Sequence, residues 1–269
     1  MRSTTTARRL RTPAVLLATA ALVLGLSGCD GYHATSPSAA RSNAKATAEP
    51  AAFAQGANGP VDCRKAKCVA LTFDAGPSVH TPELLGILKK YHVHATFFTL
   101  GKNHVRKHPE MIKDMAAQGH ELETLTWSHQ ILTKISKDEV RKEITEGRDA
   151  VYKVTGVRPT LLRPPQGRTS DGVTKVVKSL GMSEVVWSAD GADYKTTDSA
   201  LIEKRVLDKT KRDGIILLHD WVDKTNRGYN GTIAAVPGII STLQARGYTF
   251  VTVAQLLAPG KPVPGKVYK

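Results

Sequence analysis

The residues best suited to chemistry in this sequence are an aspartate, an arginine and a histidine, each placed at the end of a short apolar segment. Asp74 closes the run that begins at Cys68, Arg163 follows two leucines, and His219 closes the run that begins at Gly214. A carboxylate can take a proton, an imidazole can give one, and a planar guanidinium can hold the carboxylate in place. Side chains of these types at the ends of strands could carry acid–base chemistry if the fold brings them together.

Each residue taken singly also has a structural interpretation. Asp74 precedes Gly76-Pro77 and could simply shape a turn, and His219 could be a histidine with a structural partner. Further polar residues after apolar segments favour the chemical interpretation, because the carboxyl ends of parallel strands meet at one edge of a sheet. They are Trp127, His129, Gln166, Asp190, Asp193 and Tyr194.

The elements that must position these residues alternate across residues 60–258, which predicts a single α/β domain. Strands are expected at 69–73, 95–101, 161–163, 184–188, 214–219 and 248–253, with a short one near 120. Helices are expected at 82–91, 109–118, 171–180, 200–210 and 232–246, and a long helix to 155 opens with a capping box at Ser136 and Glu139. A complete eightfold barrel needs about 250 residues, so a distorted, reduced (β/α) barrel is predicted.

The chain resembles the NodB-homology polysaccharide deacetylases, carbohydrate esterase family four. The resemblance rests on Thr72-Phe73-Asp74, Ala95-Thr96-Phe97-Phe98 and residues 247–253, with Arg163 and His219 between them. It implies a distorted (β/α) barrel and metal-dependent removal of N- or O-acetyl groups from glycans such as peptidoglycan, chitin or xylan.

The resemblance also implies a role for each site residue. Asp74 would be the catalytic base, Arg163 would hold it, and His219 would protonate the leaving group. Asp193 would orient His219, with Asp190 as the second candidate. The residues implied to bind substrate are Tyr194 and Leu217 around the acetyl methyl, the backbone N–H of Gln166 at the oxyanion, and Trp127.

The sequence departs from the family pattern at the metal ligands. The resemblance implies an aspartate after the base and two histidines, but these positions hold Ala75, Leu125 and His129. Alanine and leucine cannot coordinate a metal, and catalytic zinc ordinarily has three protein ligands. We therefore expect no cofactor, or a divalent metal bound weakly at His129. The neighbouring residues that could substitute as ligands are His80, His120 and Glu123.

Three functions are compatible with this pattern. The chain could be a glycan-binding or regulatory module that has lost metal-dependent deacetylation. It could be an active deacetylase that works without metal or with substitute ligands. It could also be a purely structural surface protein, although Asp74, Arg163, Asp193 and His219 argue against that.

The first 28 residues have the features of an export signal. Arg8, Arg9 and Arg11 precede an apolar run over 13–28, which is short for a membrane span of about 20 residues. The run ends in Leu26-Ser27-Gly28-Cys29, which resembles a bacterial lipobox and implies lipidation of Cys29. Ordinary secretion with loss of Cys29 is the alternative, and the paired arginines are compatible with twin-arginine export.

The rest of the chain outside the domain is predicted to be unstructured. Residues 29–59 are rich in small and polar residues and predict a tether, and 259–269 predict a flexible tail. Cys63 and Cys68 are expected to form a disulfide in an oxidising compartment. A zinc site is not expected, because lipidation of Cys29 would leave only these two thiols.

Charge and localisation restrict the partners. The formal net charge is +14, which favours anionic partners, but no nucleic-acid motif is present. We expect a monomer on the extracytoplasmic face of a bacterial membrane, anchored through lipid and bound to glycan.

Overall fold

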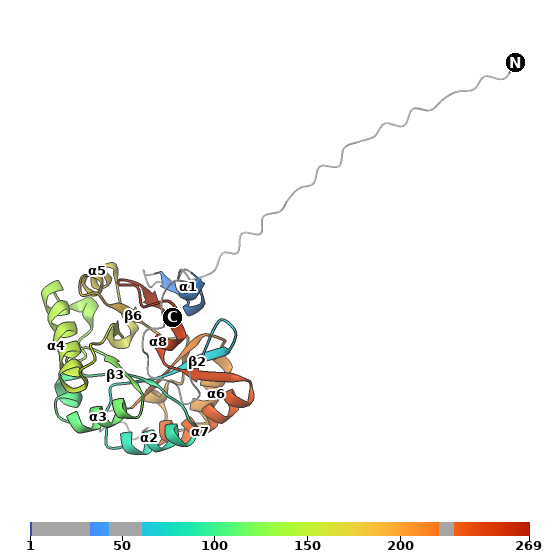
Figure 1. Ribbon diagram of the computed structural model, residues 1–269, viewed down its shortest axis with the longest axis horizontal. Coiled ribbons are helices and arrows are strands. Elements are labelled where there is room, and N and C mark those ends of the chain that lie inside the picture. Colours follow the sequence, from blue (N-terminus) through green and yellow to red (C-terminus); the bar gives the residue numbers. More distant parts are fainter. Residues whose placement is uncertain (2–32, 43–60, 221–228) are drawn as a thin grey trace. The chain divides into compact units, whose positions relative to one another are not determined.

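The structure is a computed structural model that describes Met1 and residues 33–42, 61–220 and 229–269 (Figure 1). The chain divides into two units, residues 1–30 and 31–269. Apart from Met1, the first unit lies outside the described residues. The second contains every helix and strand of the described part.

Ten strands in the described part of the chain form one sheet, and every strand pair is parallel. Their bounds are β1 (Ala34–Thr35), β2 (Lys67–Asp74), β3 (Thr96–Thr99), β4 (Glu121–Thr124), β5 (Leu161–Leu162), β6 (Ser183–Val185), β7 (Ala189–Asp190), β8 (Gly214–His219), β9 (Tyr248–Val251) and β10 (Val267–Tyr268). The order across the sheet is β1-β10-β6-β5-β4-β3-β2-β8-β7, with β9 paired to β2.

Strand β2 pairs with three others. It pairs with β8 from Val69 to Asp74, with β9 over its first four residues, and with β3 over its last three. The β9 and β3 segments do not overlap, so they share the edge of β2 opposite β8. The sheet thus closes unevenly around β2 and curls into a half-barrel, which confirms the predicted distorted (β/α) barrel in a single domain.

Helices cover the outer face of the strands. In Figure 1, α2, α3, α4, α6 and α7 surround the sheet. The helix bounds are α1 (Pro37–Ser42), α2 (Thr81–Lys90), α3 (Pro109–Ala117), α4 (Lys137–Thr155), α5 (Asp171–Ser179), α6 (Ser199–Lys209), α7 (Tyr229–Ala245) and α8 (Val253–Leu257). Short turns of helix are η1 (Gly101–Val105), η2 (Leu132–Lys134), η3 (Pro165–Gly167) and η4 (Asp193–Lys195).

Alternation along β2 and β8 separates the core from the interior of the barrel. Val69, Leu71 and Phe73 pack in the cluster that also contains helix residues of α2 and α7, whereas Ala70 belongs to a second cluster. Because successive side chains of a strand point to opposite faces, Thr72 and Asp74 lie on the inner face with Ala70. The same alternation gives Leu217 and His219 the inner face of β8.

Two local predictions are confirmed. Ser136 caps α4, and its hydroxyl accepts from the Glu139 amide while the Glu139 carboxylate accepts from the Ser136 amide. Cys63 and Cys68 form a disulfide immediately before β2. This bridge closes a short loop and so restricts where β2 begins.

The prediction of unstructured flanks is wrong at two places. Ala34–Thr35 forms β1 and Pro37–Ser42 forms α1, inside the predicted tether. In the predicted tail, Val267–Tyr268 forms β10 and pairs with both β1 and β6. The Tyr268 hydroxyl also accepts a hydrogen bond from the Val263 amide. The two flanks are ordered because each supplies the other with a hydrogen-bonding partner.

Buried contacts fix the first flank to the domain. Arg41 donates to an Asp213 carboxylate oxygen and to the Leu256 carbonyl, each at 2.6 Å, and its side chain is 4% exposed. Cys29 and the predicted signal at 1–28 fall outside the described residues apart from Met1. Among the described helices, none is long and apolar enough to cross a membrane.

Candidate active site

Asp74 and His219 lie side by side at the carboxyl ends of neighbouring strands. They are register partners in the β2–β8 ladder, and the Asp220 amide donates to the Asp74 carbonyl at 2.9 Å. Asp74 is buried, while the His219 side chain is 21% exposed. Apolar runs that form buried parallel strands therefore deliver a carboxylate and an imidazole to one edge of the barrel.

Arg163 binds Asp74 from inside the barrel. Its Nη1 donates to Asp74 Oδ1 at 2.6 Å and to Thr72 Oγ1 at 2.8 Å, and its Nε donates to the Val185 carbonyl at 3.3 Å. The guanidinium is fully buried and lies 4.1 Å from the centre of the Phe98 ring. Burial lowers the pKa of Arg163, and the Asp74 charge opposes this change.

His219 is held by a buried carboxylate. Asp193 Oδ1 lies 2.8 Å from His219 Nδ1, and Asp193 Oδ2 accepts from the His219 amide at 2.8 Å and from the Thr232 hydroxyl at 2.9 Å. Burial lowers the pKa of His219, but the charge and hydrogen bond of Asp193, with Asp74 and Asp190, raise it above its ordinary value. Burial raises the pKa of Asp193, and its bonds to His219 and Thr232 outweigh that effect and lower it.

Of the two aspartates expected to orient His219, Asp193 is the one that contacts its imidazole. Asp190 instead accepts from the Ala192 amide at 2.6 Å and so closes its own turn. Beside His219, the Tyr194 ring packs edge-on with 5.4 Å between ring centres, and it is 40% exposed. Leu217 is buried two residues before His219 on the same face of β8. The Tyr194 ring therefore covers one side of the imidazole.

Gln166 and Trp127 lie in two other loops. Gln166 is exposed in η3, three residues after Arg163, with a left-handed φ of 59°. The Trp127 indole packs against Gly101 and lies 5.5 Å from the Arg106 guanidinium, in a groove between α3 and α4. Trp127 therefore contacts the outer helices, whereas Asp74, Arg163, Asp193 and His219 form one connected group.

Glu143 of α4 holds the loop that carries His129. Its carboxylate accepts from the Ser128 amide at 2.8 Å, the Ser128 hydroxyl at 2.6 Å and the Gln130 side-chain amide at 3.1 Å. The loop contains two residues with left-handed φ, Thr126 at 94° and His129 at 68°. Burial lowers the pKa of His129, His219 lowers it further, and Asp74 and Glu143 oppose the change.

Two of the three positions that the resemblance gives to metal ligands are apolar in this chain. Ala75 and Leu125 are 7% and 1% exposed, and both belong to the buried apolar cluster that contains Phe98. Their alkyl side chains offer no lone pair, which leaves His129 as the only donor of the three. A single imidazole does not meet the donor set of a catalytic metal site, so the residues present do not fit the group.

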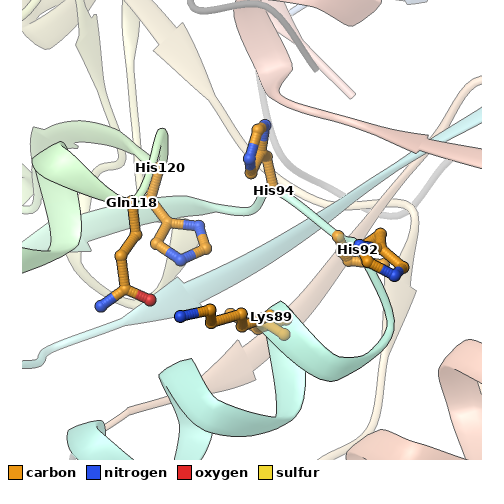
Figure 2. Close-up of a pocket in the computed structure, with 7 residues that line it drawn as sticks. Lys89, His92, His94, Gln118 and His120 are labelled. Atoms are coloured by element: carbon orange, nitrogen blue, oxygen red, sulfur yellow. The ribbon is translucent and has the colours of Figure 1, made fainter. Parts of the chain in front are cut away.

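Two of the candidate substitute ligands, His120 and Glu123, bond to backbone amides instead. His120 Nδ1 accepts from the Ala95 amide at 3.2 Å, before strands β3 and β4 begin. A neutral imidazole that accepts at Nδ1 carries its proton on Nε2, so neither nitrogen is free to bind a metal. This ring lines a pocket of about 230 Å³. Figure 2 shows it there with His94, Gln118 and Lys89. Burial, with the His94 charge, lowers the pKa of His120 to about 3.

Glu123 and His80 do not complete a site either. Glu123 accepts from the Thr160 and Leu161 amides at 3.0 and 2.8 Å, and burial raises its pKa well above the ordinary value. His80 precedes α2, where its amide donates to the Ser78 hydroxyl. In the part of the chain that the structure describes, no three His, Cys, Asp or Glu side chains converge as a metal site.

Sequence reasoning missed three residues that position the group. Thr72 accepts from Arg163 and donates to the Ile216 carbonyl at 2.6 Å. Its place two residues before Asp74 in a strand is the signal that could have found it. Thr232 and Glu143 come from distant helices, and no local pattern marks them.

Comparisons with known proteins agree with this fold. The family model described as "Polysaccharide deacetylase" matches residues 62–185. The chain is 38% identical over 191 residues to the peptidoglycan-N-acetylmuramic acid deacetylase PdaC of Bacillus subtilis, a match that spans 71% of this chain and 38% of PdaC. It is 34% identical over 194 residues to a peptidoglycan-N-acetylglucosamine deacetylase of Bacillus cereus, covering 71% of this chain and 88% of the relative.

Solved structures match as well. "T48 deacetylase with substrate" superposes with a TM-score of 0.71 at 37% identity, covering 78% of this chain and all of the other. A mutant of BA3943, described as a CE4 family pseudoenzyme with restored enzymatic activity, has a TM-score of 0.66 at 27% identity and coverages of 72% and 68%. With its parallel half-barrel and its joined Asp74–Arg163 and His219–Asp193 pairs, the chain belongs to the polysaccharide deacetylase family.

Proposed function

We propose that this chain binds acetylated cell-wall glycan at the outer face of the cell membrane and has lost metal-dependent deacetylation. The glycan class is supported by the relatives, which are named as peptidoglycan deacetylases. A further relative is a bifunctional xylanase/deacetylase of Pseudobutyrivibrio xylanivorans, 31% identical over 214 residues. Peptidoglycan is the first choice of glycan because the names of the relatives mention it most often.

The loss of metal chemistry rests on one observation. Ala75 and Leu125 replace two of the three ligands and are packed in a buried apolar cluster with Phe98. A metal placed beside this cluster would be coordinated by His129 alone. The comparison with BA3943 shows that pseudoenzymes occur in this family.

A second candidate function is hydrolysis of an acetyl group without metal. The intact pairs of Asp74 with Arg163 and of His219 with Asp193 favour it. Asp74 would take a proton from the attacking water while Arg163 holds the carboxylate, and His219, oriented by Asp193, would protonate the leaving group. Water with an unassisted pKa of about 15.7 is a poor nucleophile, so easily cleaved esters are better substrates for this route than amides.

The surroundings of the acetyl site follow from the same proposal. Leu217 and Tyr194 would contact the acetyl methyl, and the Gln166 amide would bind the oxyanion. Residues 1–28 would direct export, Cys29 would carry lipid, and the protein would act as a monomer on the extracytoplasmic face.

The experiment compares the full chain with a variant in which the ligands are restored. Metal content and acetate release from peptidoglycan, chitin oligomers and acetylated xylan are measured with Zn²⁺, Co²⁺ and Mn²⁺ for the unaltered chain and for Ala75→Asp with Leu125→His. We expect acetate release only in the double variant. Ala75→Asn with Leu125→Gln is the matched control, because it adds similar polarity without the ligand set.

The outcomes separate the two candidate functions. Metal-dependent turnover by the unaltered chain at micromolar metal would overturn the proposal. Acetate release that persists in chelator and disappears in His219→Gln would favour the metal-independent hydrolase. Glycan binding without turnover supports the proposed binding function.

A further inference from the structure

A groove of about 760 Å³ lies between α3 and α4, outside the group formed by Asp74 and His219. Trp127 forms part of its lining, and apolar walls come from Val105, Ala150 and Val154. Trp127 is two residues before His129, so the groove borders the loop that reaches the candidate active site.

Trp127 is rigidly held in this groove. Its amide donates to the Glu143 carbonyl at 2.9 Å, and its carbonyl accepts from the Lys102 amide at 2.9 Å. A Cβ added at Gly101 would lie 2.5 Å from the indole, so η1 can pack on the ring only because residue 101 is glycine. The indole is partly exposed toward the groove, which is the disposition of an aromatic platform for a sugar ring.

The lining of the groove holds three carboxylates and three cations. Its three carboxylates are already paired: Glu110 with Lys113 at 2.9 Å, Glu146 with Lys142 at 3.9 Å, and Asp149 with Arg158 at 3.0 Å. Arg106 and Lys153 also line it and are exposed. In the part of the chain that the structure describes, neither makes an ion pair with an acidic side chain, and Arg106 lies 5.5 Å from the Trp127 ring.

We propose that this groove binds a carboxylate-bearing segment of the glycan, with a sugar ring on Trp127 and the carboxylate between Arg106 and Lys153. The inference rests on the proposed glycan-binding function and deepens it, because it distinguishes an anionic wall polymer from a neutral one. Two unpaired cations beside an aromatic face match an amphipathic anion. In a peptidoglycan fragment the carboxylate belongs either to a lactyl group or to a peptide stem.

Binding to the full chain is measured with three probes. They are a neutral N-acetylglucosamine tetramer, a disaccharide with a free lactyl carboxylate, and a disaccharide that carries a stem peptide. The backbone and indole N–H resonances report where each probe binds, and Trp127→Phe assigns the indole signal. We expect the Trp127 signal to shift with a carboxylate probe and less with the neutral tetramer. Comparing the two carboxylate probes identifies which carboxylate is bound.

Charge variants then test the recognition. Exposed ion pairs contribute up to about 1 kcal/mol, so Arg106→Gln and Lys153→Gln should each weaken carboxylate binding about two- to fivefold. The affinity should also fall with added salt. Lys175→Gln on α5 is the matched control and should leave binding unchanged.

The results distinguish this inference from the proposed function. If all three probes bind equally and the charge variants have no effect, the groove proposal is overturned. If the carboxylate probes shift resonances around His219 but not Trp127, the proposed function stands and the groove is not a binding site. Failure of every glycan to bind would count against both.

Discussion

At the residue scale, His219 and Asp193 each stabilise the charged form of the other. Asp193 is buried and accepts three hydrogen bonds, two of them from His219. The pKa of His219 is raised and the pKa of Asp193 is lowered. Folding therefore favours the protonated imidazole and the ionised carboxylate, which suits the proton-donating role proposed for His219.

This coupling predicts how stability changes with pH. Because the folded pKa of His219 is above its ordinary value of about 6.5, its stabilising contribution is complete below about pH 6.5 and is lost as pH rises through the raised folded value. The free energy of unfolding of the chain minus that of His219→Gln should therefore decrease above about pH 6.5. Urea unfolding at a series of pH values measures the difference.

Asp193→Asn provides the control for this prediction. Removing the carboxylate charge should bring the pKa of His219 below its ordinary value, because burial then acts without that opposing charge. Titration of the His219 ring signals by NMR reports it directly. An unchanged His219 pKa in Asp193→Asn would contradict the assignment of Asp193 as the partner.

The backbone at Ala75 has a conformation that suits a metal-binding aspartate better than it suits alanine. Its φ of 70° is left-handed, a conformation that alanine adopts at a cost of about 1 kcal/mol and that aspartate, asparagine and glycine adopt more easily. Its amide still donates to the Phe98 carbonyl at 3.0 Å. The backbone at this position therefore suits the aspartate that the family carries here, which favours recovery of the site in Ala75→Asp with Leu125→His.

At the element scale, α4 acts as the support of the His129 loop. Glu143 binds Ser128 and Gln130, and a Cβ at Gly147 would lie 2.5 Å from the Thr126 backbone. The helix and the loop are thus in direct backbone contact. Two left-handed residues persist in this loop because α4 holds both of its sides.

Replacing Glu143 should loosen this loop. Glu143→Ala leaves the Ser128 and Gln130 donors unpaired and should cost about 2 kcal/mol of unfolding free energy. Glu143→Gln keeps the shape but removes the charge, and since that charge raises the pKa of His129, the pKa should fall further. NMR titration of His129 checks this, and Glu146→Gln, one turn along α4, is the matched control. A His129 pKa unchanged in Glu143→Gln would show that the carboxylate does not face the loop.

The elements also show what sequence can predict and what it cannot. Gly214–His219 was expected with the bounds observed, because five apolar residues bounded by turns leave little choice of ends. The helix from Lys137 was equally clear because its capping box is local. Thr232, Glu143 and the short β1 and β10 were missed, since each depends on a contact with a distant part of the chain.

The site shows the same division. The types and order of Asp74, Arg163, Asp193 and His219 could be read from the sequence, and the structure brings these four side chains together. What Trp127 contacts could not be read, because the loop after β4 turns its indole toward α3 and α4. The close contact with Gly101 and the backbone hydrogen bonds to Glu143 and Lys102 accompany that direction.

At the scale of the whole molecule, the chain before the barrel is fixed to it by an ion pair. Arg41 and Asp213 are separated by 2.6 Å and both are largely buried. Breaking a buried pair from one side costs about 3–5 kcal/mol, and the low end applies here because Arg212 Nε still lies 3.8 Å from Asp213 Oδ2. Arg41→Met should therefore lower the unfolding free energy by about 3 kcal/mol, measured by urea unfolding.

Two variants control for this effect. Lys204→Gln removes an exposed pair with Asp208 and should change stability by less than about 0.5 kcal/mol. Arg41→Met combined with Asp213→Asn removes both charges, keeps a residue type that tolerates the left-handed φ of 64° at position 213, and should recover part of the loss. A cost for Arg41→Met as small as that of Lys204→Gln would mean that residues 33–42 do not depend on this contact.

Strands β1 and β10 also determine which fragments of this protein can remain soluble. They cover one edge of β6, so that the Ser183–Val185 backbone finds its partners within the chain. Each is two residues long, so it exposes few backbone N–H and C=O groups with which another chain could pair. A fragment trimmed to residues 60–258 would lose both and leave the β6 edge open as a template for intermolecular pairing. For this chain, a protein cut to the apparent domain limits is expected to self-associate, whereas one that keeps residues 33–42 and 259–269 is not.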